Sequence, residues 1–246
     1  MTSGWAADLL LGGIVLLGAS VQWLTGMGFA LVAVPALVLV LGPAEGVVLA
    51  NCAAGAISLA GLVGGWRRVR LSAMVPLVVA SACTVPAGAW MAAHLSEPAL
   101  LMVMGGLVSA AVLLVLRGAQ VPALRGVQGA LAAGAVGGFM NSSAGVGGPP
   151  VSLYAVNAGW TVRDFVPNAQ FYGIVVNVFS VAANGANGFP HFRTPVWLLI
   201  IAAMAAGAAI GHALAQHVPE RRARLLVLGL ALAGGLTTLA KGVHGL

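Results

Sequence analysis

Long apolar runs separated by short breaks fill this chain, and they constrain its fold more than any other feature. A helix that crosses a membrane needs roughly 20 apolar residues in a row. Only 7% of the 246 residues are charged and mean hydropathy is +1.02, whereas soluble domains carry about 25% charged residues. The length allows about eight to ten such segments and no sizeable soluble domain. We therefore predict an all-α, polytopic membrane protein.

Connections rich in Gly, Pro and charge bound the apolar segments. The expected segments cover residues 9–24, 28–41, 46–65, 73–93, 99–116, 126–140, 149–160, 166–186, 195–215 and 225–241. The second and seventh are short, and each follows a glycine-rich break, so we predict re-entrant or half-helices there. The first run has no basic residues before it and follows Asp8, so we expect it to be retained rather than cleaved as a signal peptide.

The net charge of +6 comes from basic residues in the short connections between segments. Positive charge at such places sets membrane orientation, so nothing here predicts nucleic-acid binding. If each broken hairpin enters and leaves on one side, Arg193 and Lys241 lie on one face and the other nine basic residues on the opposite face. If each hairpin crosses once, the division is seven to four. The positive-inside rule favours the returning hairpins, with both termini outside.

The two halves of the chain resemble each other. Gly26 aligns with Gly145 at an offset of 119 residues (145 − 26), and the same offset pairs Asn51 with Gln170. We predict two inverted repeats, each a broken helical hairpin followed by three transmembrane helices. The predicted repeats cover residues 1–120 and 121–246. Inverted repeats with broken helices at corresponding positions are typical of secondary transporters.

The breaks also predict an anion site. A helix that begins inside the membrane, at Gly28 or near Gly148, has free N–H groups and a partial positive charge at its N-terminus. Two such ends that point inward from opposite sides can bind an anion without Lys or Arg. The alternative is that these glycines only let neighbouring helices pack closely.

Neutral polar residues gather near both breaks, and we take them as candidate substrate-binding residues. The predicted site consists of Gln22, Thr25, Gly26, Gly28, Asn51, Asn141, Ser142, Ser143, Gly145, Gly147, Gly148 and Gln170. Their donors suit an oxyanion, although a single such residue more often forms an interhelical hydrogen bond. Asn177 and Asn184 follow Gln170 at helical spacing, so they either line the same cavity or bond neighbouring helices.

Few residues point to catalysis or to a cofactor. All five acidic residues lie at segment ends or in loops, so proton coupling would need another carrier, and no Walker motif is present. Cys52 and Cys83 lie singly in apolar runs, without metal-ligand spacing. An intramembrane hydrolase that used Ser142 or Ser143 would need a base, and His212 is the only histidine well inside a segment. We predict no enzymatic activity, no metal and no cofactor.

Two glycine–proline patterns carry a family resemblance. They are Gly26-Met27-Gly28 with Pro35 and, in degenerate form, Gly145-Val146-Gly147-Gly148 with Pro149-Pro150. The chain resembles the TauE/SafE family of sulfite and organosulfonate permeases over nearly its whole length. Phe29 stands where the family has glycine, and Tyr154 occupies the position that matches Pro35. The resemblance implies transport of a small sulfur-containing anion, such as sulfite, thiosulfate or an organosulfonate, across a bacterial inner membrane.

The leading hypothesis is a secondary transporter, or permease, in which the two inverted halves rock about a central site. The expected partners are a small sulfur-containing anion and the lipid bilayer. The alternatives are a passive anion channel on the same fold, a transporter of another small organic solute, and a subunit of a larger complex. The coupling ion, the direction of transport and a homo-oligomer stay open at this point.

Overall fold

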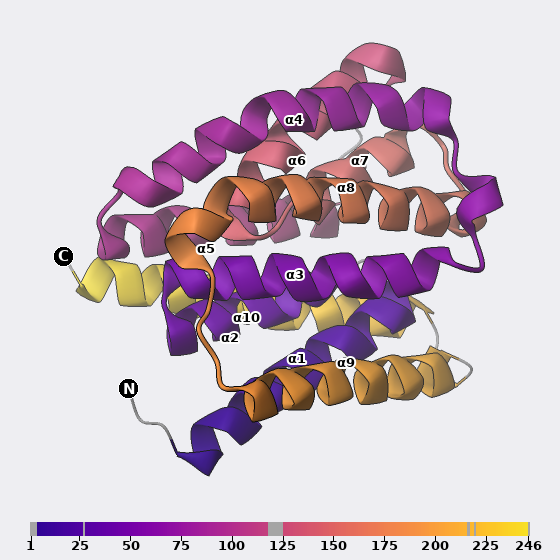
Figure 1. The fold of residues 1–246 in the computed structure, drawn as a ribbon. Helices are drawn as coiled ribbons and strands as arrows, with labels where there is room; N and C mark the ends of the chain where they lie inside the picture. The colour runs from indigo at the N-terminus through magenta and orange to yellow at the C-terminus, as the bar shows by residue number, and fades with distance from the viewer. Residues whose placement is uncertain (1–3, 27, 118–124, 216, 219, 246) are drawn as a thin grey trace.

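The computed structural model describes residues 4–26, 28–117, 125–215, 217–218 and 220–245, and it is helical throughout (Figure 1). All ten predicted segments are helices, extended by a few residues at most ends. Their bounds are α1 Trp5–Thr25, α2 Phe29–Leu41, α3 Pro43–Leu62, α4 Leu71–His94, α5 Glu97–Leu116, α6 Gly126–Ala144, α7 Gly148–Asn157, α8 Val162–Gly188, α9 Thr194–Ala215 and α10 Glu220–His244. A single 3-10 turn, η1, covers Trp66–Arg68 between α3 and α4.

Seven of the described helices are long and apolar enough to cross a membrane, namely α1, α3, α4, α5, α8, α9 and α10. By contrast α2 has 13 residues and α7 has 10, which is too short for a full crossing. Large apolar side chains such as Leu17, Ile201 and Leu230 are exposed on the outer surface of the bundle, as contact with lipid requires. The prediction of an all-α, multi-pass membrane protein is confirmed.

Both helical hairpins turn at a left-handed glycine. Gly26 follows α1 with φ 79°, and Gly145 follows α6 with φ 68°. This conformation favours glycine because a Cβ would clash with the backbone. The surroundings are also tight, since a Cβ on Gly26 would lie 2.9 Å from Val166, and one on Gly145 would lie 2.9 Å from Val34. The two turns occupy the matched positions of the sequence repeat. Met27, within the first break, lies outside the described residues.

Helix packing relates the two halves of the chain. The first helix of each half packs on the fourth helix of the other, because α1 contacts α9 and α6 contacts α4. The counterparts α3 and α8 pack on each other, as do α5 and α10. Gly61 of α3 lies against Gln170, and Gly188 of α8 lies against Ala44, so α3 and α8 are antiparallel. Inverted halves require this geometry. The inversion and the repeat boundary stay predictions, and residues 118–124 lie outside the described part.

The start of α1 and the end of α10 lie at the same end of the bundle, here called the terminal end (Figure 1). Both short helices run back along their partners. The ring of Phe29 in α2 packs at the position of Gly18 in α1, and Gly147 before α7 lies against Gly137 in α6. Each hairpin therefore begins and ends at one end of the bundle, as the returning arrangement predicts. That the terminal end faces outside stays a prediction.

The buried apolar side chains form two separate cores. The larger core joins α1, α2, α3, α5, α9 and α10 around residues such as Phe29 and Leu37, and it also takes in Ala144 at the end of α6 and Val146 in the second break. The smaller core joins α4, α6, α7 and α8 around Met74, Leu77 and Tyr172. This division does not follow the two halves of the sequence, because α4 belongs to the first half and packs with helices of the second. The polar residues of the molecule's centre lie between the two cores.

Membrane orientation gives the first prediction. A reporter fused after Leu246 that is active only outside the inner membrane should be active, because the returning hairpins and the nine basic residues place the terminal end outside. A second fusion of the same reporter after Leu116, at the opposite end of the bundle, should be inactive. The reverse pattern for the two fusions would show that the terminal end faces inside.

Close packing of α4 on α6 gives the second prediction. A Cβ on Gly138 would lie 2.6 Å from the backbone carbonyl oxygen of Ser81, so Gly138→Ala should destabilise the fold by about 1–3 kcal/mol through overpacking. The matched control is Gly106→Ala in α5, where a Cβ meets nothing within 4 Å. Thermal unfolding of the detergent-solubilised protein measures both variants. Equal unfolding temperatures for the two would contradict the tight α4–α6 contact.

Candidate functional site

A cavity of about 240 Å³ lies between the two helix breaks. Its inner part is formed by the ends of α1 and α6, the starts of α2 and α7, and the middle of α3 and α8. Trp160, Phe165 and Val227 line its outer part, and they lie at the end of the bundle opposite the termini. None of the described lining residues comes from a connection at the terminal end. The cavity therefore extends toward the end that carries most of the basic residues.

Most of the predicted site residues line this cavity. They are Gln22, Thr25, Gly26, Gly28, Asn141, Gly147, Gly148 and Gln170. Asn51 lies behind Asn141 and bonds to it, while Gly145 forms the second turn without lining the cavity. Ser142 and Ser143 line a separate cavity of about 40 Å³, together with Asn184. Asn177, for which two roles were open, lines the main cavity.

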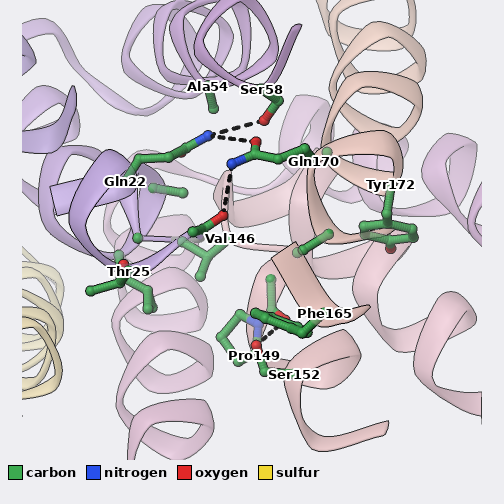
Figure 2. Close-up of a pocket in the computed structure, with 18 of the residues that line it drawn as sticks. Gln22, Thr25, Ala54, Ser58, Val146, Pro149, Ser152, Phe165, Gln170 and Tyr172 are labelled. Atoms are coloured by element: carbon green, nitrogen blue, oxygen red, sulfur yellow. Dashed lines mark hydrogen bonds between the residues drawn. The ribbon is translucent and has the colours of Figure 1, made fainter. Parts of the chain in front are cut away.

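A glutamine cluster ties the first break to α3 and α8 (Figure 2). The Nε2 of Gln22 donates to Ser58 Oγ at 3.0 Å and to Gln170 Oε1 at 3.4 Å. The Nε2 of Gln170 donates to the carbonyl oxygen of Gly26 at 3.0 Å. All three side chains are buried. The carbonyl oxygen of Gly26 lies just past the end of α1, where no helical N–H group donates to it. The cluster therefore supplies the hydrogen-bond donor that this oxygen needs.

An asparagine cluster does the same at the second break. The Nδ2 of Asn141 lies 3.3 Å from Asn51 Oδ1, 3.0 Å from Asn177 Oδ1 and 2.9 Å from Ser180 Oγ. Its Oδ1 accepts from the backbone N–H of Gly147 at 3.1 Å. Asn141 therefore joins the start of α7 to α3 and α8.

The two clusters are counterparts in the sequence repeat. The offset of 119 residues pairs Gln22 with Asn141, Ser58 with Asn177, and Asn51 with Gln170. Exchanging the halves of the chain therefore converts one cluster into the other. Ser58 was missed in the sequence analysis, and the repeat could have found it, because it matches Asn177. The cavity is also lined by Tyr172, Trp160 and Phe165. The sequence repeat does not mark these three residues as site residues.

The starts of the two short helices differ in their free N–H groups. The first three N–H groups of α2, from Phe29 onward, have no acceptor within the helix. In α7 the residue Gly148 is followed by Pro149 and Pro150, which have no backbone N–H, and the N–H of Gly147 is already bonded. The start of α7 therefore offers fewer free backbone N–H groups than the start of α2. Most of the free backbone donors belong to α2.

The described side chains that line the cavity are uncharged. They include no Asp, Glu, Lys, Arg or His. Tyr172 is held in place, since its hydroxyl group lies 2.9 Å from Ser81 Oγ. No group of three or more His, Cys, Asp or Glu side chains that could hold a metal occurs in the described part of the chain. The cavity therefore offers neutral hydrogen-bond donors beside apolar rings.

The serines considered for catalysis are bonded within their own helix. Ser142 Oγ donates to the carbonyl oxygen of Gly138 at 3.1 Å, and Ser143 Oγ donates to that of Phe139 at 2.7 Å. His212 is exposed on the outer face of α9, edge-on to Trp23 with ring centroids 6.3 Å apart. These contacts place neither serine hydroxyl in a hydrogen bond with a histidine.

Asn141 and Ser143 make a matched pair for the third prediction. Both are buried in α6, but Asn141 bonds three other segments and Ser143 bonds only its own helix. Asn141→Ala should lower the free energy of unfolding by about 1–3 kcal/mol, because it leaves buried groups such as the Gly147 N–H unpaired. Ser143→Ala should change it by less. Thermal unfolding checks both, and a larger loss in Ser143→Ala would show that the cluster is not what holds the break.

Comparison with known proteins adds one finding. A family model described as "Sulfite exporter TauE/SafE" matches residues 10–238, a range that contains both breaks and both polar clusters. No curated protein and no solved structure matches the chain.

Proposed function

Since the chain belongs to the sulfite exporter TauE/SafE family, we propose that it is a secondary transporter of a small sulfur-containing anion such as sulfite, thiosulfate or an organosulfonate. We place it in the inner membrane of a bacterium, where its seven long apolar helices cross the bilayer. The observation that carries the proposal is the cavity between the two breaks, because neutral donors from both halves of the chain converge on it.

The chemistry of the cavity supports an anionic substrate. Ser58, Asn177 and Gln170 present hydroxyl and amide groups to it, and the start of α2 adds backbone N–H groups and the positive end of a helix dipole. No acidic side chain lines the described cavity to repel an anion. The apolar rings of Trp160 and Phe165 lie toward its outer part, where they would contact the organic group of a sulfonate.

We further propose that transport moves the smaller core against the larger one. Close-packed apolar cores resist deformation, whereas the interface between the two cores is polar and contains the cavity. Hydrogen bonds such as Gln22–Gln170 and Asn51–Asn141 cross this interface, and exchanging such bonds costs only about 1 kcal/mol each. This motion of the cores differs from the predicted rocking of one sequence half against the other. The reason is that α4 belongs to the first half of the sequence but packs in the smaller core with helices of the second half.

The fourth prediction tests transport directly. Purified protein in proteoliposomes should show saturable flux of sulfite, thiosulfate or a small alkylsulfonate. Gln170→Ala should lower this flux tenfold or more, because it removes the donor to the Gly26 carbonyl and a side chain of the cavity. Thr237→Ala, an exposed change on α10, should leave the flux unchanged.

The same experiment separates the alternatives. Conductance that follows the membrane potential without saturating would indicate a passive anion channel. Flux of a neutral amino acid, with none for any sulfur anion, would indicate a transporter of another organic solute. Either result would overturn the proposed substrate or the proposed mechanism.

A further inference from the structure

We propose that Ser58 and Asn177 form an oxyanion subsite, in which the Ser58 hydroxyl group and the Asn177 Nδ2 each donate to an oxygen of the transported anion. The subsite lies on the α3–α8 wall of the cavity, next to the helix breaks. The inference rests on the proposed function and deepens it, because it assigns the side chains that recognise the substrate.

Ser58 has a donor that the protein leaves unused. The side chain is 3% exposed, and its Oγ accepts from Gln22 Nε2 at 3.0 Å. Buried serines in helices usually donate back to a carbonyl oxygen one turn earlier, as Ser81 and Ser142 do here. Among the described residues Ser58 has no such acceptor. Because Gln22 occupies an acceptor position of the oxygen, the hydroxyl hydrogen is free to point into the cavity.

Asn177 presents a second unused donor. It is 6% exposed, and its Oδ1 accepts from Asn141 Nδ2 at 3.0 Å. That bond fixes the orientation of the amide group and turns Nδ2 away from Asn141. In the described part of the chain no acceptor bonds to Nδ2, and this atom is not among the fully buried unpaired polar atoms, so it keeps access to the cavity that Asn177 lines. A bound oxyanion would supply that acceptor.

Gly173 lies directly beside both donors. A Cβ on this residue would lie 2.8 Å from Ser58 Oγ and 4.0 Å from Asn177 Nδ2. Gly173 is in the middle of α8 and lines the cavity. Both donors therefore lie within 4.0 Å of the same point beside α8, and a methyl group there would press against the Ser58 hydroxyl group. An anion with two oxygens on one centre can accept from both donors at ordinary hydrogen-bond distances.

The subsite also bridges the two cores. Ser58 is on α3 in the larger core, and Asn177 is on α8 in the smaller core. The two residues are counterparts in the repeat, so each half of the chain supplies one donor. An anion held by both would link the bodies that we propose to move. A halide ion or a neutral solute without paired oxygens would leave one donor unpaired and bind less well.

The decisive variant is Gly173→Ala, which places a methyl group against the Ser58 hydroxyl group and removes no polar group. Its matched control is Gly185→Ala in the same helix, where a Cβ meets nothing within 4 Å. Binding of sulfite, methanesulfonate and chloride to detergent-solubilised protein is measured by calorimetric titration and by ligand-induced thermal stabilisation. We expect Gly173→Ala to weaken binding of the two sulfur oxyanions at least tenfold. Gly185→Ala should bind them like the unaltered protein, and chloride should bind weakly to all three.

Ser58→Ala keeps the test valid if Gly173→Ala does not fold, and it too should weaken oxyanion binding about tenfold. Tight oxyanion binding to both Gly173→Ala and Ser58→Ala would overturn the subsite while the proposed function stands. If the unaltered protein binds and transports no sulfur oxyanion, the proposed function fails and the subsite fails with it. Chloride binding as tight as sulfite binding would overturn the role of paired oxygens.

Discussion

A backbone that stops being helical inside a membrane must find new partners for its polar groups, because lipid offers none. The centre of this structure follows from that constraint, which applies at two places. Gln170 donates to the carbonyl oxygen of Gly26 at the first break, and the Asn141 side chain accepts from Gly147 at the second. Both partners are amides, which can donate and accept at once. The polar clusters that repair the breaks thereby bring α3 and α8 to the same point.

Repairing the breaks also creates the cavity. The amides are held by each other, so they stay in place without charged residues. A few donors remain unused, notably on Ser58 and Asn177. A site of neutral, oriented donors can bind an anion and release it again, which a carrier requires, whereas a buried Lys or Arg would hold the anion more tightly.

The two apolar cores lie on either side of this site. The fourth helix of each half packs on the first helix of the other half, so the halves interlock instead of sitting side by side. Ion pairs reinforce this arrangement at the surface, where Arg70 binds Asp164 at 2.8 Å and Arg193 binds Asp8 at 3.3 Å. The first pair joins the approach to α4 with α8, within the smaller core. The second joins the approach to α9 with α1, within the larger one. Neither of these two pairs joins one core to the other.

The sequence by itself determined the ten helices, the two breaks and most of the residues around the cavity. Apolar length, glycine and proline act locally, so they can be read without knowledge of the packing. Only the tertiary structure decided which neighbours share a face. Asn141 reaches the cavity and Ser142 does not, because successive residues of a helix point about 100° apart. The sequence also did not predict that α4 packs on α6. Lipid-facing and buried helix surfaces are both apolar in a membrane protein, so hydrophobicity does not distinguish them.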